Sequence, residues 1–329
     1  MKLQREPPGA RTVTAACPVC RAESSAPYWE NMYRIGEVHF HLVRCPCGMV
    51  YVNPRPDDET LAWMYADPDY YHEGYTLGVE TEGYFSRREE LLELYGDMMA
   101  ELERELGAPG RLMELGSAGG FLLEAARRRG WHVRGVEVSA PAVAYARDEL
   151  GLEIFAGELK NAPYPEGSFD LVIADNVLEH TTDPAGVLEQ LWRLLPAGGH
   201  LLVIVPSYVN SPYFRLLGRA KRLLPARLLG ERLLRILKMD PEHDGGHPYH
   251  LLEFDRRRIL RALGQAGFEI RSAQSSLPMP AHLFKTDTRS LRLLALRGVF
   301  RALDTLMRLG LAPGARTRVL ARRPAESPH

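Results

Sequence analysis

The sequence lacks the features that would place it in several large classes of protein. Its 329 residues contain no apolar run as long as the roughly 18 residues that a membrane-spanning helix needs. Residues 1–10 are polar and lack the apolar core of a signal peptide. Apolar residues make up 45% and charged residues 25% of the chain, which is ordinary for a globular protein. We therefore expect a cytoplasmic protein of about two domains.

Cysteine is scarce, and its placement is informative. The chain has only 4 cysteines, which form two close pairs: Cys17 with Cys20, and Cys45 with Cys47. Two such pairs, separated by a short segment, are typical of a tetrahedral zinc site of the ribbon type, and four protein ligands make that zinc structural. The tight second pair leaves His39 and His41 as substitute ligands. Free thiols or a disulfide are the alternatives to a metal, and a reducing cytoplasm disfavours the disulfide.

Neither sign of charge is in excess, because the net charge is −1, but the basic residues are unevenly distributed. Residues 213–238 hold eight Lys and Arg residues against one acid, and leucines recur among them. We expect two helical insertions, at 207–250 and 281–312, each with a basic face. Such a face lies in solvent, forms a lid or a homodimer contact, or makes a peripheral contact with an anionic membrane. Aromatic residues are not interleaved with the arginines, so we expect no nucleic-acid partner.

The stretch at residues 111–120 organises the rest of the chain. Its sequence, RLMELGSAGG, leads from apolar residues to an acid and then to small residues, and a helical pattern follows. This order predicts the strand, tight turn and helix N-terminus of a βαβ unit, whose backbone can approach a ligand closely. The dinucleotide fingerprint G-x-G-x-x-G fails here, because Phe121 occupies the place of its third glycine. An NAD-dependent oxidoreductase is therefore the weaker alternative.

Five segments, in the same order along the chain, resemble the motifs of class I S-adenosylmethionine-dependent methyltransferases. The first motif, (D/E)-x-G-x-G-x-G, is matched by Glu114, Gly116, Ala118 and Gly120, with alanine at the middle glycine. The others are residues 163–175, the V-L-E-H and D-P pattern of 177–184, the turn L-P-A-G-G at 195–199 and A-G-F at 266–268. The resemblance implies an α/β fold with a Rossmann-like, seven-stranded sheet whose last strand is antiparallel, and S-adenosylmethionine as cofactor.

The resemblance also implies roles for individual residues. Glu137, 21 positions after the first glycine of the motif, would bind both ribose hydroxyls from the end of the second strand. Glu158 and Leu159 match the residues that flank the adenine. Asp175 and Asn176 follow the central strand and should border the methyl-transfer centre, because ligands bind at the carboxyl ends of strands in open α/β sheets.

The segments around the cofactor domain complete the predicted plan. Residues 1–56 resemble the N-terminal zinc-binding segment of a bacterial methyltransferase subgroup, many of whose members act on sugars, lipids or natural products. Residues 57–110 are expected to form a helical linker or cap over the active site. The methyltransferase domain is expected at 111–324, with the two helical insertions inside it, and residues 325–329 as a tail.

In methyl transfer the protein contributes little covalent chemistry, because the sulfonium of S-adenosylmethionine already makes its methyl group electrophilic. The protein aligns the acceptor and, where this is a hydroxyl, removes its proton, a task that suits histidine. The candidate bases are His180, beside the predicted cofactor site, and His247 and His250, in a loop expected to face it. Some quinone-biosynthesis O-methyltransferases bind a divalent cation at E-x-x-E-H, but Asn176 replaces the first acid here, so we expect no active-site metal.

The acceptor is the least determined part of the hypothesis. We expect a small or carrier-bound molecule of acidic character, such as a sugar, lipid, quinone-like compound or natural-product intermediate, because the basic insertions favour an anionic partner. The sequence leaves open whether oxygen, nitrogen or carbon is methylated. A non-enzymatic zinc-ribbon binding module with a degenerate cofactor domain is the remaining alternative.

Overall fold

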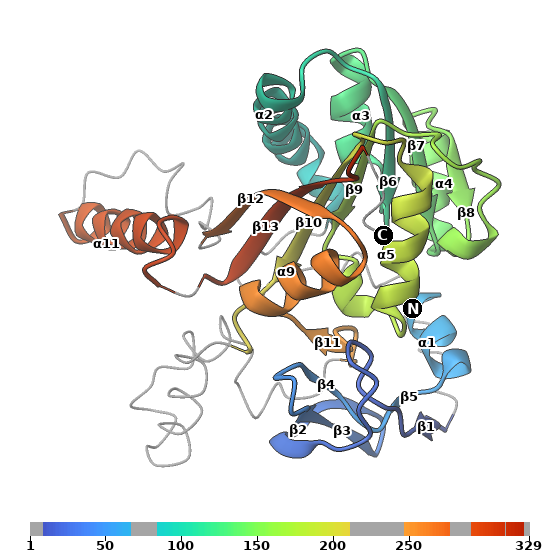
Figure 1. The fold of residues 1–329 in the computed structure, drawn as a ribbon, viewed down its shortest axis with the longest axis vertical. Coiled ribbons are helices and arrows are strands. Elements are labelled where there is room, and N and C mark those ends of the chain that lie inside the picture. Colours follow the sequence, from blue (N-terminus) through green and yellow to red (C-terminus); the bar gives the residue numbers. More distant parts are fainter. Residues whose placement is uncertain (1–8, 67–83, 211–246, 277–290, 313, 326–329) are drawn as a thin grey trace.

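A computed structural model describes residues 9–66, 84–210, 247–276, 291–312 and 314–325 (Figure 1). The basic stretch at 213–238 and the start of the second predicted insertion, 281–290, lie outside these residues. Within the described ranges, we find no helix with the length and apolar character needed to cross a membrane.

The central element is a seven-stranded sheet with the order β12-β13-β10-β9-β6-β7-β8. Its strands are β6 (Arg111–Leu115), β7 (His132–Glu137), β8 (Ile154–Ala156), β9 (Leu171–Asp175), β10 (His200–Pro206), β12 (Glu269–Ser276) and β13 (Arg316–Arg322). Five neighbouring strands pair in parallel, in the order β10-β9-β6-β7-β8. β13 runs antiparallel to both of its neighbours, β10 and β12. The predicted seven-stranded sheet with an antiparallel last strand is confirmed.

Helices cover both faces of this sheet (Figure 1). One face packs against α2 (Arg88–Leu106), α3 (Phe121–Arg128) and α4 (Ala140–Asp148), and the other against α5 (Pro184–Leu194) and α9 (Arg256–Gln265). Because successive side chains of a strand point to opposite faces, Leu112 packs with the first group and Met113 with the second. Burial on both faces explains why the central strands β9 and β10 are almost continuously apolar.

A second, four-stranded sheet contains the N-terminal strands and one strand from the C-terminal half. We call it the ribbon sheet; it has the order β11-β4-β3-β2. Its strands are β2 (Ala26–Ile35), β3 (Val38–Arg44), β4 (Val50–Val52) and β11 (Leu252–Glu253), and the last lies between β10 and α9 in the sequence. The ribbon sheet occupies the lower end of the molecule in Figure 1. Phe40 and Met49 share one core with Phe254 and Ile259, so the two sheets are packed together.

Shorter elements connect these sheets. β1 (Thr12–Val13) pairs with β5 (Arg55–Pro56), and α1 (Asp58–Tyr65) follows. Asp57 caps α1, because its side chain accepts a hydrogen bond from the Thr60 backbone N–H at 2.8 Å. The 3-10 helices are η2 (Tyr84–Arg87), η3 (Leu159–Asn161) and η4 (Leu178–His180), and α11 (Leu291–Arg308) packs beside β12. The break between β4 and β5 falls at Asn53 and Pro54, where proline ends the strand.

Candidate active site

The loop between β6 and α3 turns sharply at residues with left-handed backbone conformation. The φ angles of Gly116, Ala118 and Gly120 are +68°, +46° and +81°. Such angles favour glycine, so Ala118, which replaces the middle glycine of the motif, is the strained position. A Cβ atom added to Gly116 would lie 2.5 Å from Cγ2 of Val177. The segment that follows β9 therefore packs directly on this loop.

Glu137, at the end of β7, is fixed beside the loop. Its carboxylate accepts hydrogen bonds from the backbone N–H groups of Ala118 and Ser139, each at 2.8 Å, and its side chain is buried. These two bonds orient the carboxylate at the carboxyl edge of the sheet. Since each oxygen of a carboxylate can accept more than one hydrogen bond, the group is also suited to ribose hydroxyl donors.

Glu114, the acid that opens the motif, is a buried carboxyl group. Burial, followed by the charges of Asp175 and Glu137, raises the pKa of Glu114 well above its usual range. Its Oε2 atom, and the hydroxyl groups of Ser117 and Ser139, are buried without a hydrogen-bond partner among the described residues. Buried polar atoms are normally paired, so these fit a polar ligand at this edge.

Asp175 and Asn176 adjoin this group at the end of β9. The carboxylate of Asp175 lies 2.7 Å from the guanidinium of Arg316, on β13, and accepts a hydrogen bond from the side-chain amide of Asn176 at 2.9 Å. Glu158 behaves differently, because its side chain is 61% exposed and lies 2.6 Å from Lys160, whereas Leu159 is buried. The residues that the sequence nominated for cofactor binding thus follow β6, β7, β8 and β9, whose ends meet at one edge.

The structure brings two of the three candidate bases together. The rings of His180, in η4, and His250, just before β11, meet edge-on with centroids 5.0 Å apart. Nδ1 of His180 lies 2.7 Å from the carbonyl oxygen of Tyr249 and 3.1 Å from the hydroxyl of Tyr65. The ring centroid of His247 lies 5.3 Å from that of Trp63 in α1 and 5.7 Å from that of Tyr249.

A family model described as a methyltransferase domain matches residues 84–273, which is more than half of the chain. The chain belongs to this family. It is a class I S-adenosylmethionine-dependent methyltransferase, and the strand order of the sheet and the relatives described below are consistent with this assignment.

Several curated relatives of this methyltransferase are ubiquinone biosynthesis O-methyltransferases. The one from Aromatoleum aromaticum is 30% identical over 176 residues, which are 51% of this chain and 68% of the relative. The one from Alkalilimnicola ehrlichii is 33% identical over 133 residues, which are 39% of this chain and 50% of the relative. The chain thus spans about half to two thirds of these relatives. A solved S-adenosylmethionine-dependent methyltransferase from Mesorhizobium loti is 20% identical, with a TM-score of 0.41, and covers 65% of this chain and 90% of its own.

Glu179 completes the histidine group of the methyltransferase. It is fully buried, and both carboxylate oxygens lack a hydrogen-bond partner in the described part of the chain. Burial, to which the charges of Asp175 and Glu253 add, raises the pKa of Glu179 well above its usual range. One ligand atom from each of Glu179, His180 and His250 falls within 4.8 Å of the others, a spacing that a divalent cation can use. His250 stands far from Glu179 in the sequence, so only the fold brings it to this group.

Residues that the sequence did not nominate also contribute to this region. Arg316 holds Asp175, and Tyr65 contacts His180. Burial, then the charges of Asp175 and Glu114, raises the pKa of Tyr95 in α2. Arg316 and Tyr95 come from elements that carry no motif. Only the packed fold identifies them.

Glu114 gives a prediction on pH dependence. The folded apoprotein keeps a proton on Glu114 that the unfolded chain releases above a pKa near 4.5, so stability falls as pH rises through the interval between the two pKa values. Glu114→Gln, which is neutral and similar in shape, should remove this loss. In denaturant titrations, we expect the variant to match the wild type near pH 4.5 and to gain up to about 1.4 kcal/mol per pH unit above it. Glu149→Gln, at an exposed position, is the control; a gain for Glu114→Gln that does not change with pH would contradict the assignment.

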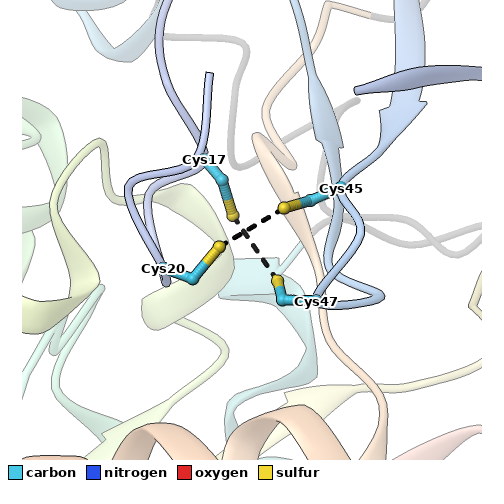
Figure 2. Close-up of side chains that lie close together, drawn as sticks. All are labelled: Cys17, Cys20, Cys45 and Cys47. Atoms are coloured by element: carbon cyan, nitrogen blue, oxygen red, sulfur yellow. Dashed lines mark hydrogen bonds between the residues drawn. The ribbon is translucent and has the colours of Figure 1, made fainter. Parts of the chain in front are cut away.

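The four cysteines converge beside the turn between β3 and β4 of the ribbon sheet (Figure 2). The sulfur atoms of Cys17 and Cys47 lie 3.8 Å apart and those of Cys20 and Cys45 lie 3.3 Å apart, and all four lie within 4.8 Å of one another. Zinc–sulfur bonds of about 2.3 Å place the sulfur atoms of a tetrahedral site about 3.8 Å apart. The cluster therefore fits a tetrahedral zinc ion.

The histidines proposed as substitute ligands lie outside this cluster. Nδ1 of His41 accepts a hydrogen bond from the backbone N–H of Asn31 at 3.1 Å, and His39 is exposed on β3. The second cysteine pair closes on Gly48, whose φ is +88°. The left-handed backbone of this turn favours glycine, and the guanidinium of Arg258 packs against the position where a Cβ atom would lie.

Proposed function

We propose that this methyltransferase transfers the sulfonium methyl group of S-adenosylmethionine to a hydroxyl group on a small or carrier-bound acidic acceptor, with a histidine as general base. The observation that carries the proposal is Glu137, whose carboxylate is held by two backbone N–H groups beside the glycine-rich loop. A fixed anion at the end of the second strand is suited to a ribose.

The residues of this edge would hold the cofactor, which supplies an electrophilic methyl group when bound. Glu137 would accept hydrogen bonds from the ribose hydroxyls, and Glu158 and Leu159 would flank the adenine. The left-handed turns at Gly116, Ala118 and Gly120 leave the loop backbone accessible for close approach. Asp175 and Asn176 would border the site, with Arg316 fixing the carboxylate of Asp175.

The histidines would act on the acceptor. Val177 packs on Gly116, and His180 follows three residues later in η4, on the same segment after β9. His180 and His250 form one edge-on pair, and either neutral ring can accept the proton of a hydroxyl. The protein would thus provide alignment and a base. The buried carboxyl group of Glu179 lies beside His180, with 3.9 Å between Oε1 and Nε2.

Two observations support an acidic hydroxyl acceptor. A cavity of about 280 Å³ lies at the carboxyl end of β10, and its lining includes two basic residues, Arg256 and Arg257, and one acid, Asp255. Guanidinium groups suit carboxylates and phosphates. The relatives that are named as ubiquinone biosynthesis O-methyltransferases methylate oxygen, as that name states, which favours the same class of acceptor atom here.

We also infer that the cysteine cluster binds a structural zinc ion. The sulfur spacing supports it, and four cysteine ligands leave no position for a substrate. Burial raises the pKa of the Cys17 thiol to about 11, so zinc must displace at least this proton when it binds.

The test combines binding and transfer. In calorimetry, we expect S-adenosylmethionine to bind and NAD not to bind. Incubation with cofactor carrying a labelled methyl group and fractionated cell extract should then yield a labelled product, whose mass identifies the acceptor. With that acceptor, His180→Ala and His250→Ala should separate the roles of the two rings, and the variant that removes the base should lose about 10²- to 10⁴-fold in rate with cofactor binding intact. Tight binding of NAD instead, or salt-sensitive retention of nucleic acid without transfer, would reject the proposal.

A further inference from the structure

The ribbon sheet reaches into the histidine group through β11. Leu252 and Glu253 pair with Tyr51 and Val50 of β4, and the backbone N–H of Val52 donates to the carbonyl of Leu251 at 2.9 Å. The N–H of Leu251 in turn donates to the carbonyl of Glu179 at 2.8 Å. One short backbone segment therefore ties the N-terminal sheet to the carboxyl edge of the central sheet, and His250 immediately precedes it.

Side chains follow the same route. The hydroxyl of Tyr33, in β2, donates a hydrogen bond to Oε1 of Glu253 at 3.0 Å, and Glu253 is 1% exposed. The same Oε1 atom lies 3.9 Å from Nδ1 of His250. Burial, then the charge of Glu253, raises the pKa of Tyr33, so its hydroxyl stays a donor. A buried line of polar groups thus runs from Tyr33 through Glu253 to His250.

We propose that Glu253, held by Tyr33, is a positioning residue that orients His250, so that the ribbon sheet is a working part of the active site. This inference rests on the proposed function, because it concerns how a candidate base is presented to the acceptor. A carboxylate that faces Nδ1 favours the tautomer with its proton on Nδ1 and leaves Nε2 as the acceptor of a proton. The separation of 3.9 Å is longer than a hydrogen bond, and such contacts commonly tighten when the site is filled.

Among the contacts given for the described residues, the other groups beside His250 do not offer this control. His180 meets it edge-on, and Glu179 is fully buried, with a pKa raised well above the usual range, which favours its neutral form. The hydroxyl of Tyr65 and the carbonyl of Tyr249 both lie close to His180. Glu253 is therefore the carboxylate best placed to select the tautomer of His250.

The experiment is nitrogen NMR of the full chain with labelled histidine and with S-adenosylmethionine bound, at a pH where the ring of His250 is neutral, with His250→Gln to assign the signal. In the wild type, we expect the Nδ1–H form of His250 to exceed the Nε2–H form at least about tenfold, the ratio that one hydrogen bond to a charged group provides. Glu253→Gln should abolish this excess, and Tyr33→Phe should reduce it. Tyr51→Phe, a buried tyrosine of the same sheet that lies by the cysteines, should leave it unchanged.

Titration with S-adenosylmethionine separates this inference from the proposed function. All four variants should bind the cofactor as the wild type does, because none of the substituted residues lies in the glycine-rich loop. If the wild-type ring shows no excess of Nδ1–H, or if Glu253→Gln leaves the excess intact while cofactor binding is normal, Glu253 does not position His250 and the inference is overturned. Loss of cofactor binding in the wild type would instead reject the proposed function.

Discussion

Glu137→Ala should weaken S-adenosylmethionine binding by roughly 10²- to 10⁴-fold while leaving the chain folded. The proposed role gives this carboxylate two ribose hydroxyls, and a hydrogen bond to a charged group is worth about 1.5–3 kcal/mol. The carboxylate also holds the backbone N–H groups of Ala118 and Ser139, so its loss loosens the loop that the cofactor contacts. Isothermal titration gives the dissociation constant, and denaturant titration gives the accompanying loss of stability.

Two further variants make this result specific. Glu149→Ala removes an exposed carboxylate just after α4 and should leave the dissociation constant unchanged. Glu137→Gln keeps one acceptor oxygen and a side chain of the same size, so its binding should fall between those of the wild type and Glu137→Ala. Wild-type affinity in Glu137→Ala would show that the ribose is held elsewhere, whatever the stability of that variant.

The sequence was sufficient to predict which residues gather at the edge proposed for the cofactor, because the relevant signals are local. Strand, turn and helix alternate from β6 onward, and each predicted residue stands at the end of a strand or directly after it. In a parallel sheet those ends meet at one edge, so local assignments place Glu114, Glu137 and Asp175 near one another without further information. The four cysteines were equally accessible, because their pairing along the chain carries the chemistry of the site.

The arrangement of the residues proposed to face the acceptor could not be predicted from local sequence patterns. β11 has only two residues, too few for a periodic pattern, and its partner β4 lies about two hundred residues earlier in the chain. The contacts of Tyr33 with Glu253, and of Tyr65 with His180, therefore have no local signature. His180 and His250 were nominated separately, but only the fold shows that they form a pair and that His247 stands with Trp63.

Cys45→Ser should remove the zinc and, with it, the activity. The wild type is expected to contain one zinc ion per chain, measured by plasma emission spectrometry on protein that has been freed of loosely bound metal. Serine is a poor ligand for zinc, so the variant should lose most of the ion. Structural zinc contributes about 10–16 kcal/mol of apparent binding free energy in isolated zinc-finger peptides. We expect a loss in the free energy of unfolding of several kcal/mol, because the ribbon sheet shares a core with α9.

The activity should fall for a reason that the cofactor site does not share. Loss of zinc should loosen β4, which pairs with β11. Leu251, just before β11, donates its backbone N–H to the carbonyl of Glu179, so the position of His250 relative to Glu179 depends on this pairing. The glycine-rich loop and Glu137 belong to the central sheet, so cofactor affinity should persist at temperatures where that sheet stays folded. His39→Ala is the matched control, because it removes an exposed histidine of the same sheet that was a candidate ligand, and it should retain one zinc ion and full activity. A wild-type protein that contains no zinc, or a Cys45→Ser variant with unchanged stability and activity, would refute both the metal site and its link to the histidines.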